Sequence, residues 1–407
     1  MASKSADQVE LQVMSGGGER SDGSAGALPA RYKREGSVLA PLSREYVVAR
    51  WCAVALAAFA CVGVGVGVGV AAERRAGSSV GPSFGAYTAA AREPDDYLSF
   101  LVIGDWGRRG DTNQTAVARA MGACAEASDP DFVVSVGDNF YEGGLNSVDD
   151  PEFASSFADV YTHPSLQVPW HVILGNHDYG DCGMDDANVE ELPCPNPADV
   201  GRSPKYQTDA RLRSRDWRWN APEERNFDLR PVADAHLFFV DTNVHVTSYE
   251  VRSWHASVSE GLATRDKAAE KAAFEAKLAA SDARWKFVFG HHPMRSNGYW
   301  GDVSDVRDAL ELILANGGVA AYFNGHDHDM QHTPVTVSGK RLHHFTSGAG
   351  SKTGRGFGDA DTAFERDAPG FAAVRVRRED VRVQFWGAGE DEGLLYEVVV
   401  SHPGGVD

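Results

Sequence analysis

The stretch Phe132–Tyr141, with the sequence FVVSVGDNFY, joins an apolar run to a short polar cluster. Short runs rich in β-branched and aromatic residues are typical of buried strands. The glycine that follows this run lets the backbone turn sharply, so the next side chain points away from the end of the strand. The stretch therefore predicts a core strand whose end presents Asp138 and Tyr141.

The same arrangement occurs at four more places along the chain. The other apolar runs are Leu98–Ile103, Trp170–Leu174, Trp285–Phe289 and Val319–Phe323. The polar clusters after them are Gly104–Gly107 (GDWG), Gly175–Asp178 (GNHD), Gly290–His292 (GHH) and Gly325–His328 (GHDH). Because the carboxyl ends of strands are where α/β sheets bind ligands, we expect these clusters to meet at one place. Their side chains predict a metal site.

Seven side chains of these clusters are candidate metal ligands: Asp105, Asp138, Tyr141, Asn176, His291, His326 and His328. Oxygen and imidazole donors without a thiolate suit iron, manganese or zinc. Seven donors are too many for one tetrahedral zinc, but they fit two ions that share a carboxylate and keep positions for water and substrate. A lone Asp or His is more often a cap or a packing residue, so the prediction depends on the five clusters together.

The order of the clusters GDWG, GDNFY, GNHD, GHH and GHDH resembles the purple acid phosphatases of the small, tartrate-resistant type. These enzymes belong to the calcineurin-like metallophosphoesterase superfamily. Tyr141 indicates this branch, since the protein Ser/Thr phosphatases of the superfamily have no phenol at that place. The resemblance extends from about Tyr97 to about Val400 and includes Ser347–Gly350.

The resemblance implies an acid phosphatase that hydrolyses phosphate monoesters by attack of a metal-bound hydroxide at a dinuclear Fe(III)–M(II) site. The resemblance implies that Asp105, Tyr141 and His328 bind the ferric ion. Asn176, His291 and His326 would bind the divalent ion (Fe, Zn or Mn), and the Asp138 carboxylate would bridge the two ions. A phosphodiesterase or nucleotide pyrophosphatase on the same scaffold is the alternative. A catalytically silent surface protein is a third hypothesis, against which the intact ligand set argues.

Three further residues are candidates for catalysis. His177 follows a ligand and is expected to contact the substrate phosphate and assist the leaving group. Asp178 is expected to orient the His177 ring, with a simple loop cap as the alternative. His292 stands where the mammalian small enzymes have Tyr, and the loop Met294–Trp300 lacks their second acid candidate, a His. His292 would partly replace that acid, or it would pack under the loop.

The chain before the first strand differs in character. Residues 1–50 are rich in Gly, Ser and Ala and predict a disordered cytosolic leader. Trp51–Ala72 holds 22 residues without a charge, enough to span roughly 30 Å of hydrocarbon. Since basic residues precede it, we expect a type II membrane protein with an extracellular or lumenal catalytic domain. The alternative is a signal peptide cleaved near Ala72, which would give a secreted protein.

Residues 73–96 are expected to be a linker, 97–400 the catalytic domain and 401–407 a tail. Helix-like stretches at Gln114–Ala127 and Lys267–Ser281 alternate with strands. The end of the chain predicts antiparallel hairpins at Arg341–Ser347, Ala372–Val376, Val381–Trp386 and Leu394–Val400. The pattern predicts an α/β fold of two mixed sheets with helices outside, and the resemblance implies the same four-layer α-β-β-α sandwich.

Cysteine usage and charge set the remaining bounds. Cys182 and Cys194 flank one loop and are candidates for a local disulfide, whereas Cys124 is expected to be buried in a helix. Asn113 begins a glycosylation sequon. The formal net charge of −19 argues against nucleic acid and large polyanions as partners, and it favours small phosphate monoesters as substrates. No obligate protein partner is predicted.

Overall fold

The computed structural model describes residues 96–182, 201–252, 254 and 260–402, which belong to one compact unit, Val80–Asp407. The expected leader, the hydrophobic segment 51–72 and nearly all of the linker lie outside the described residues. Within the described ranges, no helix is long and apolar enough to cross a membrane. The predicted membrane segment therefore stays a prediction.

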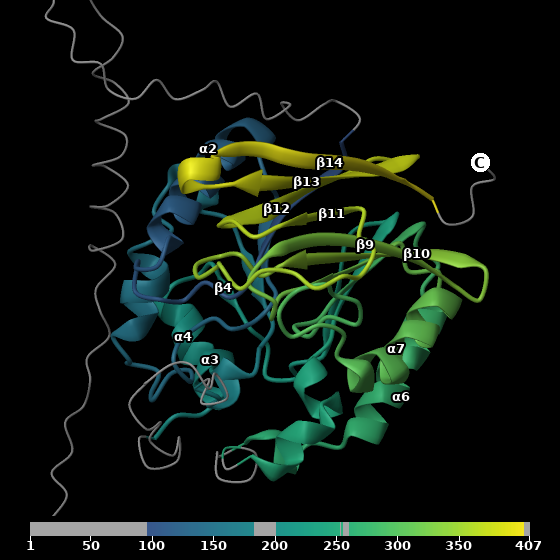
Figure 1. Cartoon of the computed structure of the whole chain (residues 1–407). Coiled ribbons are helices and arrows are strands. Elements are labelled where there is room, and N and C mark those ends of the chain that lie inside the picture. Colours follow the sequence, from purple (N-terminus) through teal and green to yellow (C-terminus); the bar gives the residue numbers. More distant parts are fainter. Residues whose placement is uncertain (1–95, 183–200, 253, 255–259, 403–407) are drawn as a thin grey trace, which may run out of the picture. The chain divides into compact units, whose positions relative to one another are not determined.

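Two seven-stranded sheets form the centre of the described unit (Figure 1). The first sheet has the order β14 (Gly393–Ser401), β13 (Asp380–Gly387), β12 (Gly370–Val376), β1 (Leu98–Ile103), β2 (Phe132–Ser135), β3 (Trp170–Val172) and β4 (Trp219–Asn220). The second has the order β11 (Phe364–Arg366), β9 (Met330–Val337), β10 (Lys340–Ser347), β8 (Ala321–Asn324), β7 (Trp285–Phe289), β6 (Ala235–Phe239) and β5 (Phe227–Val232).

Both sheets are mixed. Strands β1 to β4 run parallel, and β12, β13 and β14 add antiparallel neighbours on the β1 side. In the second sheet β6, β7, β8 and β10 run parallel, and β5, β9 and β11 are antiparallel to their neighbours. The parallel strands matter for the site, because their carboxyl ends lie at one edge of each sheet.

The alternation of side chains along β1 explains how the layers pack. Phe100 and Val102 point into the core between the sheets, where the Phe100 ring lies edge-on to Phe289 at 6.0 Å. Leu101 and Ile103 belong to a second core on the other face of the first sheet. Successive strand residues face opposite sides, so a strand that is apolar throughout is buried on both faces.

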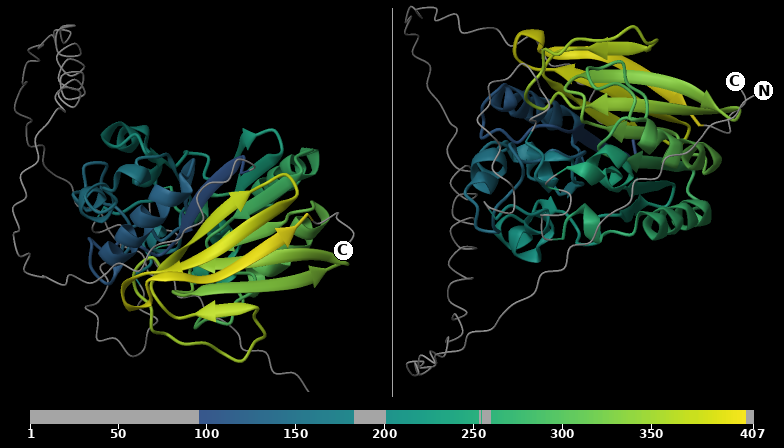
Figure 2. Two further views of the ribbon diagram at one scale, coloured as in Figure 1. Left: turned by 90° about the horizontal axis from the view of Figure 1, so that it is seen from above. Right: turned by 60° about the horizontal axis from the view of Figure 1, so that its bottom comes forward.

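Helices cover the outer faces of both sheets. Helix α2 (Gln114–Ser128) packs on the first sheet, and α6 (Lys267–Ala280) and α7 (Ser304–Asn316) contribute to the core on the outer face of the second. Figure 1 shows α2 on the opposite side of the described unit from α6 and α7. Figure 2 shows the same ribbon from two further directions. The short helices α3 (Lys205–Thr208) and α4 (Ala210–Arg215) lie near β4.

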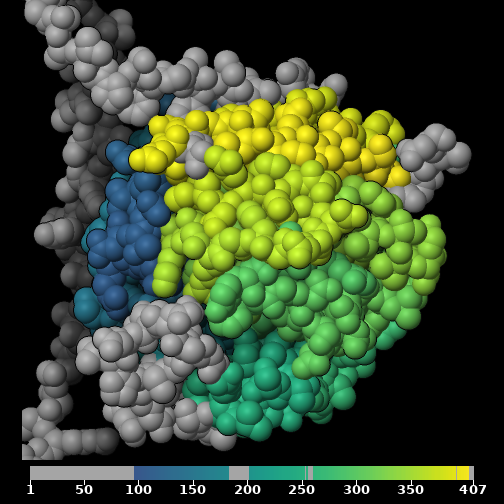
Figure 3. Space-filling view, viewed as in Figure 1, coloured from purple at the N-terminus to yellow at the C-terminus, as the bar shows by residue number. Residues whose placement is uncertain are grey.

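The predicted pair of mixed sheets with flanking helices is confirmed. Strands β12, β13 and β14 form the expected hairpins, but the expected strand Arg341–Ser347 joins the other sheet as part of β10. In the space-filling view of Figure 3, the chain from β9 to β14 covers the upper part of the visible face. The chain of α6 and α7, in green, lies below it.

Candidate metal centre

The polar clusters lie just beyond strand ends of both sheets. Asp105, Asp138 and Asn176 follow β1, β2 and β3 of the first sheet, whereas His291 and His326 follow β7 and β8 of the second. Strands β1, β2 and β3 are parallel neighbours, and so are β7 and β8. The carboxyl ends of the strands therefore lie at one edge of each sheet. The predicted clusters therefore meet where the two sheets face each other.

The backbone at three of these residues has an unusual conformation. Asp105, Asp138 and His326 have φ values of 61°, 52° and 71°, which lie in the left-handed region. Such a conformation costs a non-glycine residue on the order of 1–3 kcal/mol and persists only where the surroundings impose it. Gly175 shows how tightly the loops pack, since a Cβ there would overlap the Asp138 carboxylate.

Each of the two aspartates uses one oxygen to fix a neighbouring loop. Asp138 Oδ1 accepts a hydrogen bond from the backbone N–H of His177 at 2.9 Å, and Asp105 Oδ2 accepts one from the backbone N–H of His326 at 3.0 Å. The second oxygen of each carboxylate faces the other candidate ligands. The aspartates thus join loops of both sheets and present one oxygen each to a common space.

Three candidate ligands gather around the Tyr141 hydroxyl. Its oxygen lies 3.2 Å from Asp105 Oδ1, 3.1 Å from Asp138 Oδ2 and 3.1 Å from His328 Nε2. The His328 nitrogen is in turn 3.5 Å from Asp105 Oδ1. These four atoms, all on buried side chains, form the first ligand group, which contains the whole ferric set that the resemblance implies.

A second ligand group forms around the amide oxygen of Asn176. Asn176 Oδ1 lies 3.0 Å from His291 Nε2 and 3.1 Å from His326 Nδ1. His291 Nε2 is 3.4 Å from Asp138 Oδ2, the atom that also belongs to the first group. The Nδ1–H of His291 donates to the Val136 carbonyl at 2.9 Å, which leaves Nε2 as the coordinating atom. Asp138 thus lies between the two groups.

The electrostatics of the groups fit bound cations. Burial raises the pKa of Asp105 well above its usual range, and Asp138 raises it further. Burial also raises the pKa of the Tyr141 hydroxyl, and the carboxylates of Asp105 and Asp138 add to that shift. These groups bind metals in their ionised forms, which a bound cation favours. The donor set and its burial therefore fit a dinuclear metal centre.

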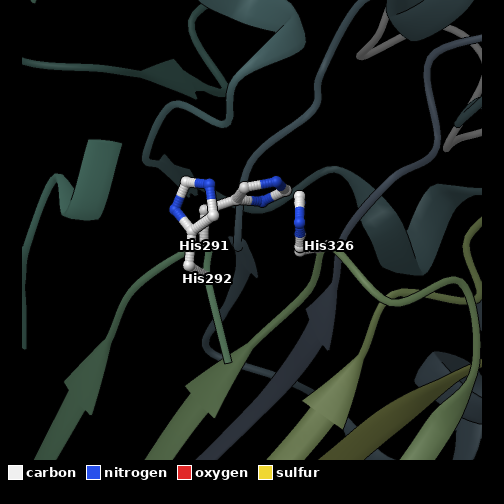
Figure 4. Close-up of side chains that lie close together, drawn as sticks. All are labelled: His291, His292 and His326. Atoms are coloured by element: carbon white, nitrogen blue, oxygen red, sulfur yellow. The ribbon is translucent and has the colours of Figure 1, made fainter. Parts of the chain in front are cut away.

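Three histidines lie close together at the second group, to which two of them, His291 and His326, belong (Figure 4). His291, His292 and His326 have ring nitrogens within 4.8 Å of one another. His292 differs from the other two because both of its ring nitrogens have hydroxyl partners: Nδ1 lies 2.8 Å from Thr242 Oγ1, and Nε2 lies 2.7 Å from Tyr249. These contacts fit the packing alternative for His292, and its acid role stays a prediction.

The His177 ring lies at the edge of the first group. It packs on the Tyr141 ring at a centroid distance of 4.4 Å, and its Nε2 is 3.9 Å from Asp138 Oδ2. Its Nδ1 is 3.7 Å from Glu142 Oε2. Glu142 was not expected from the sequence as a site residue, although it directly follows Tyr141. Among the described residues, its carboxylate is the one that forms an ion pair with Nδ1 of His177. Its other oxygen binds Arg108 at 2.7 Å.

The hydrogen bonds of Asp178 fit the loop-cap alternative better than the expected orientation of the His177 ring. The Asp178 carboxylate is fully buried and accepts hydrogen bonds from the backbone N–H groups of Gly175 at 2.8 Å and Asn139 at 2.9 Å, and from Gln207 Nε2 at 2.8 Å. Because the chain turns into a short 3₁₀ helix at His177, adjacent side chains diverge. Asp178 therefore ties the loops after β2 and β3 together.

A cavity of about 330 Å³ opens beside both ligand groups. Its lining includes the metal-group residues Asp138, Asn176, His326 and His328, and it also includes Arg108, Glu142, His177, Trp300, Lys352 and Arg355. Arg108 lies with its guanidinium carbon 3.6 Å from the centre of the Tyr141 ring. The volume is at the small end of the range for ligand pockets, which suits a small substrate.

The sequence profile of the calcineurin-like phosphoesterase family matches residues 98–330. Purple acid phosphatase 17 of Arabidopsis thaliana is 40% identical over 308 residues, which cover 72% of this chain and 81% of the plant protein. Purple acid phosphatase 4 of the same plant is 38% identical over 303 residues, 73% of this chain and 82% of its own length. The chain belongs to the purple acid phosphatase family.

More distant relatives agree with this membership. Tartrate-resistant acid phosphatase type 5 of Sus scrofa is 27% identical, with 74% of this chain and 86% of the pig protein covered. The solved structure of the lupin purple acid phosphatase PPD1 matches with a TM-score of 0.53 at 14% identity, over 75% of this chain and 53% of that one. At such low identity the structural match shows the shared fold alone. The membership makes this purple acid phosphatase a phosphatase with a dinuclear metal centre.

Two other sequence predictions for this purple acid phosphatase have different outcomes. Cys124 is buried in α2 and free, as expected. The Cys182–Cys194 disulfide stays a prediction, because Cys194 lies outside the described residues. Glu142 and Arg108 are two residues of the cavity lining that the sequence did not indicate. Their only signal is adjacency to the clusters, since Arg108 follows the first cluster and Glu142 the second.

Proposed function

We propose that this purple acid phosphatase hydrolyses small phosphate monoesters at a dinuclear centre of Fe(III) and a divalent Fe, Zn or Mn ion. The proposed ferric ligands are Asp105, Tyr141 and His328, the divalent ligands are Asn176, His291 and His326, and Asp138 is the bridge. The observation that supports this division is the meeting of two ligand groups at one atom, Asp138 Oδ2.

The chemistry of the donors supports the assignment of the two ions. A phenolate is a hard, strongly donating ligand, and together with the Asp105 carboxylate it favours a trivalent ion in the first group. The neutral amide oxygen of Asn176 and two imidazoles suit a divalent ion in the second. When bound, such a centre lowers the pKa of water and stabilises charge on the phosphoryl group.

We assign the leaving-group proton to His177. Its ring lines the cavity and lies between the Tyr141 ring and the Glu142 carboxylate. With Glu142 near Nδ1, the ring is held so that Nε2 lies on the side of Asp138, where a substrate phosphate would be bound. A proton on Nε2 is then within reach of the departing oxygen, which is the geometry that a general acid needs.

The experiment that tests the proposal compares an aryl phosphate monoester with the corresponding diester. The full chain, purified in detergent with its metals, is assayed with both esters across pH. We expect hydrolysis of the monoester in acid and little hydrolysis of the diester. A preference for the diester would assign the chain to the phosphodiesterase alternative instead.

We further propose that residues 51–72 anchor the protein in a membrane with the catalytic domain on the extracellular or lumenal side. The support is the length of this uncharged segment and the basic residues before it. In cells that make the full chain, the protein should stay with membranes after alkaline extraction. Release of a product that begins after Ala72 would indicate a cleaved signal.

A further inference from the structure

Trp300 is an exposed aromatic residue at the cavity beside the second ligand group. It is 40% exposed, and it lines the same cavity as His177 and His326. The Trp300 ring lies 5.9 Å from the His326 ring, and the two planes differ by only 32°. An indole with this much exposed surface next to a proposed metal ligand is available to contact a bound molecule.

The position of Trp300 is fixed by the metal-binding loop itself. Its backbone N–H donates to Asp327 Oδ1 at 2.8 Å, and Asp327 lies between the ligands His326 and His328 in the sequence. The other oxygen of Asp327 accepts a 2.5 Å hydrogen bond from Ser296 Oγ. The loop that carries Trp300 is therefore tied at two points to the buried carboxylate between two ligands.

Two further side chains also hold the indole itself. The Tyr299 ring meets it edge-on at a centroid distance of 4.9 Å, and the guanidinium carbon of Arg355 lies 5.3 Å from its centre. These contacts restrict the ring before a substrate arrives, which reduces the entropy lost on binding. A fixed aromatic surface of this kind favours flat aromatic partners, which stack on it or meet it edge-on.

We propose that Trp300 is the surface against which the leaving group packs, so that the enzyme prefers phosphate monoesters whose leaving group carries an aromatic ring. This inference rests on the proposed function, because it takes the phosphate to be bound at the two ligand groups. From there the leaving group extends into the cavity, where Trp300 is an exposed aromatic side chain that packs beside the proposed divalent-site ligand His326.

The test compares benzyl phosphate with cyclohexylmethyl phosphate. Both are esters of primary alcohols, so they differ chiefly in whether the ring is aromatic. The ratio of their kcat/KM values is measured for the full-length enzyme, for Trp300→Leu and for Trp300→Phe. Trp217→Leu is the matched control, since Trp217 is 58% exposed and lies outside the cavity lining. Both kcat/KM values of a ratio are measured on the same preparation. The ratio therefore does not depend on the fraction of the protein that is active.

We expect the wild-type ratio to favour benzyl phosphate and Trp300→Leu to lower it by about three- to tenfold, the range for one aromatic pair. The change should occur mainly in KM. Trp300→Phe and Trp217→Leu should keep most of the preference. An unchanged ratio in Trp300→Leu, with both esters still hydrolysed, would overturn the inference alone. A wild-type enzyme that hydrolyses neither ester would contradict the proposed function itself.

Discussion

The hydrogen-bond partners of the Asp178 carboxylate are all donors. Backbone N–H groups of Gly175 and Asn139 and the side-chain amides of Asn139 and Gln207 all point to its two oxygens. A buried carboxylate is tolerated where such donors satisfy it, and removing the charge leaves them without a proper partner. This residue therefore stabilises the loops that carry Asp138 and Asn176.

Replacement of Asp178 by Asn should destabilise the protein and not only slow catalysis. The new amide N–H₂ would face N–H donors, so we expect the free energy of unfolding to fall by about 3 kcal/mol. Urea unfolding measures this, with Asp159→Asn at an exposed position as the control. Unchanged stability with a lower kcat would restore the idea that Asp178 acts on the His177 ring.

The role of His177 predicts a dependence on the leaving group. The variant His177→Ala should lose far more rate on alkyl phosphates than on activated aryl phosphates, because only a poor leaving group needs a proton as it departs. General acids typically contribute about 10²–10⁴-fold. Comparison of kcat for both ester types in the two proteins measures this. Equal losses would show that His177 binds phosphate without donating a proton.

The sequence indicated the seven candidate ligands because each lies in a short polar cluster that begins with a glycine after a strand. It did not indicate Glu142 or Trp300 as site residues, since their roles come from neighbours that are distant in sequence. Trp300 depends on Asp327 for its position, and the Glu142 carboxylate lies 3.7 Å from Nδ1 of His177. Contacts of this kind become visible only once the two sheets are packed together.

Helix α7 was not expected from the sequence, although its residues carry a clear helical pattern. Val306, Leu310 and Leu314 recur every four residues and are buried, whereas Leu312 on the same helix is 54% exposed. This spacing is the helical pattern, and it was present in the sequence. The pairing of β10 with β8 and β9 had no such signal, since periodicity does not identify the neighbouring strand.

The two faces of α7 predict opposite results for equivalent substitutions. Leu314→Ala should lower the free energy of unfolding by about 3 kcal/mol, because it leaves a cavity under the helix. Leu312→Ala should change it by less than about 0.5 kcal/mol, because that side chain contacts mostly water. Chemical denaturation of both variants measures the difference. Equal effects would mean that α7 does not pack on the second sheet as described.

At the scale of the whole molecule, four buried or half-buried histidines contribute to the dependence of stability on pH. Burial lowers the pKa of His171 and His343 to about 4 and that of His332 and His344 to about 3. The unfolded chain binds these protons near pH 6.5, so it takes up more protons than the folded protein between that pH and the lowered values. These groups therefore make stability fall as the pH drops below 6.5.

His344 offers the clearest test of this effect. It is 1% exposed, and neither ring nitrogen has a hydrogen-bond partner. The Glu311 carboxylate, 3.6 Å from Nε2, is already bound by Arg295 at 2.8 Å. Between pH 7.5 and pH 5, His344→Leu should lose about 2 kcal/mol less unfolding free energy than the wild type. Urea titrations at both pH values measure this, and an identical loss would contradict the lowered pKa.

Metal content and the visible spectrum together test whether Tyr141 binds iron in a dinuclear centre. The full chain should contain iron and a second metal and should absorb visible light through the iron–phenolate pair. Tyr141→Phe should lose that absorption, whereas Tyr161→Phe should keep it, since Tyr161 is a buried tyrosine of the core on the outer face of the first sheet. A colourless, iron-free protein, or an absorption unchanged in Tyr141→Phe, would contradict the account.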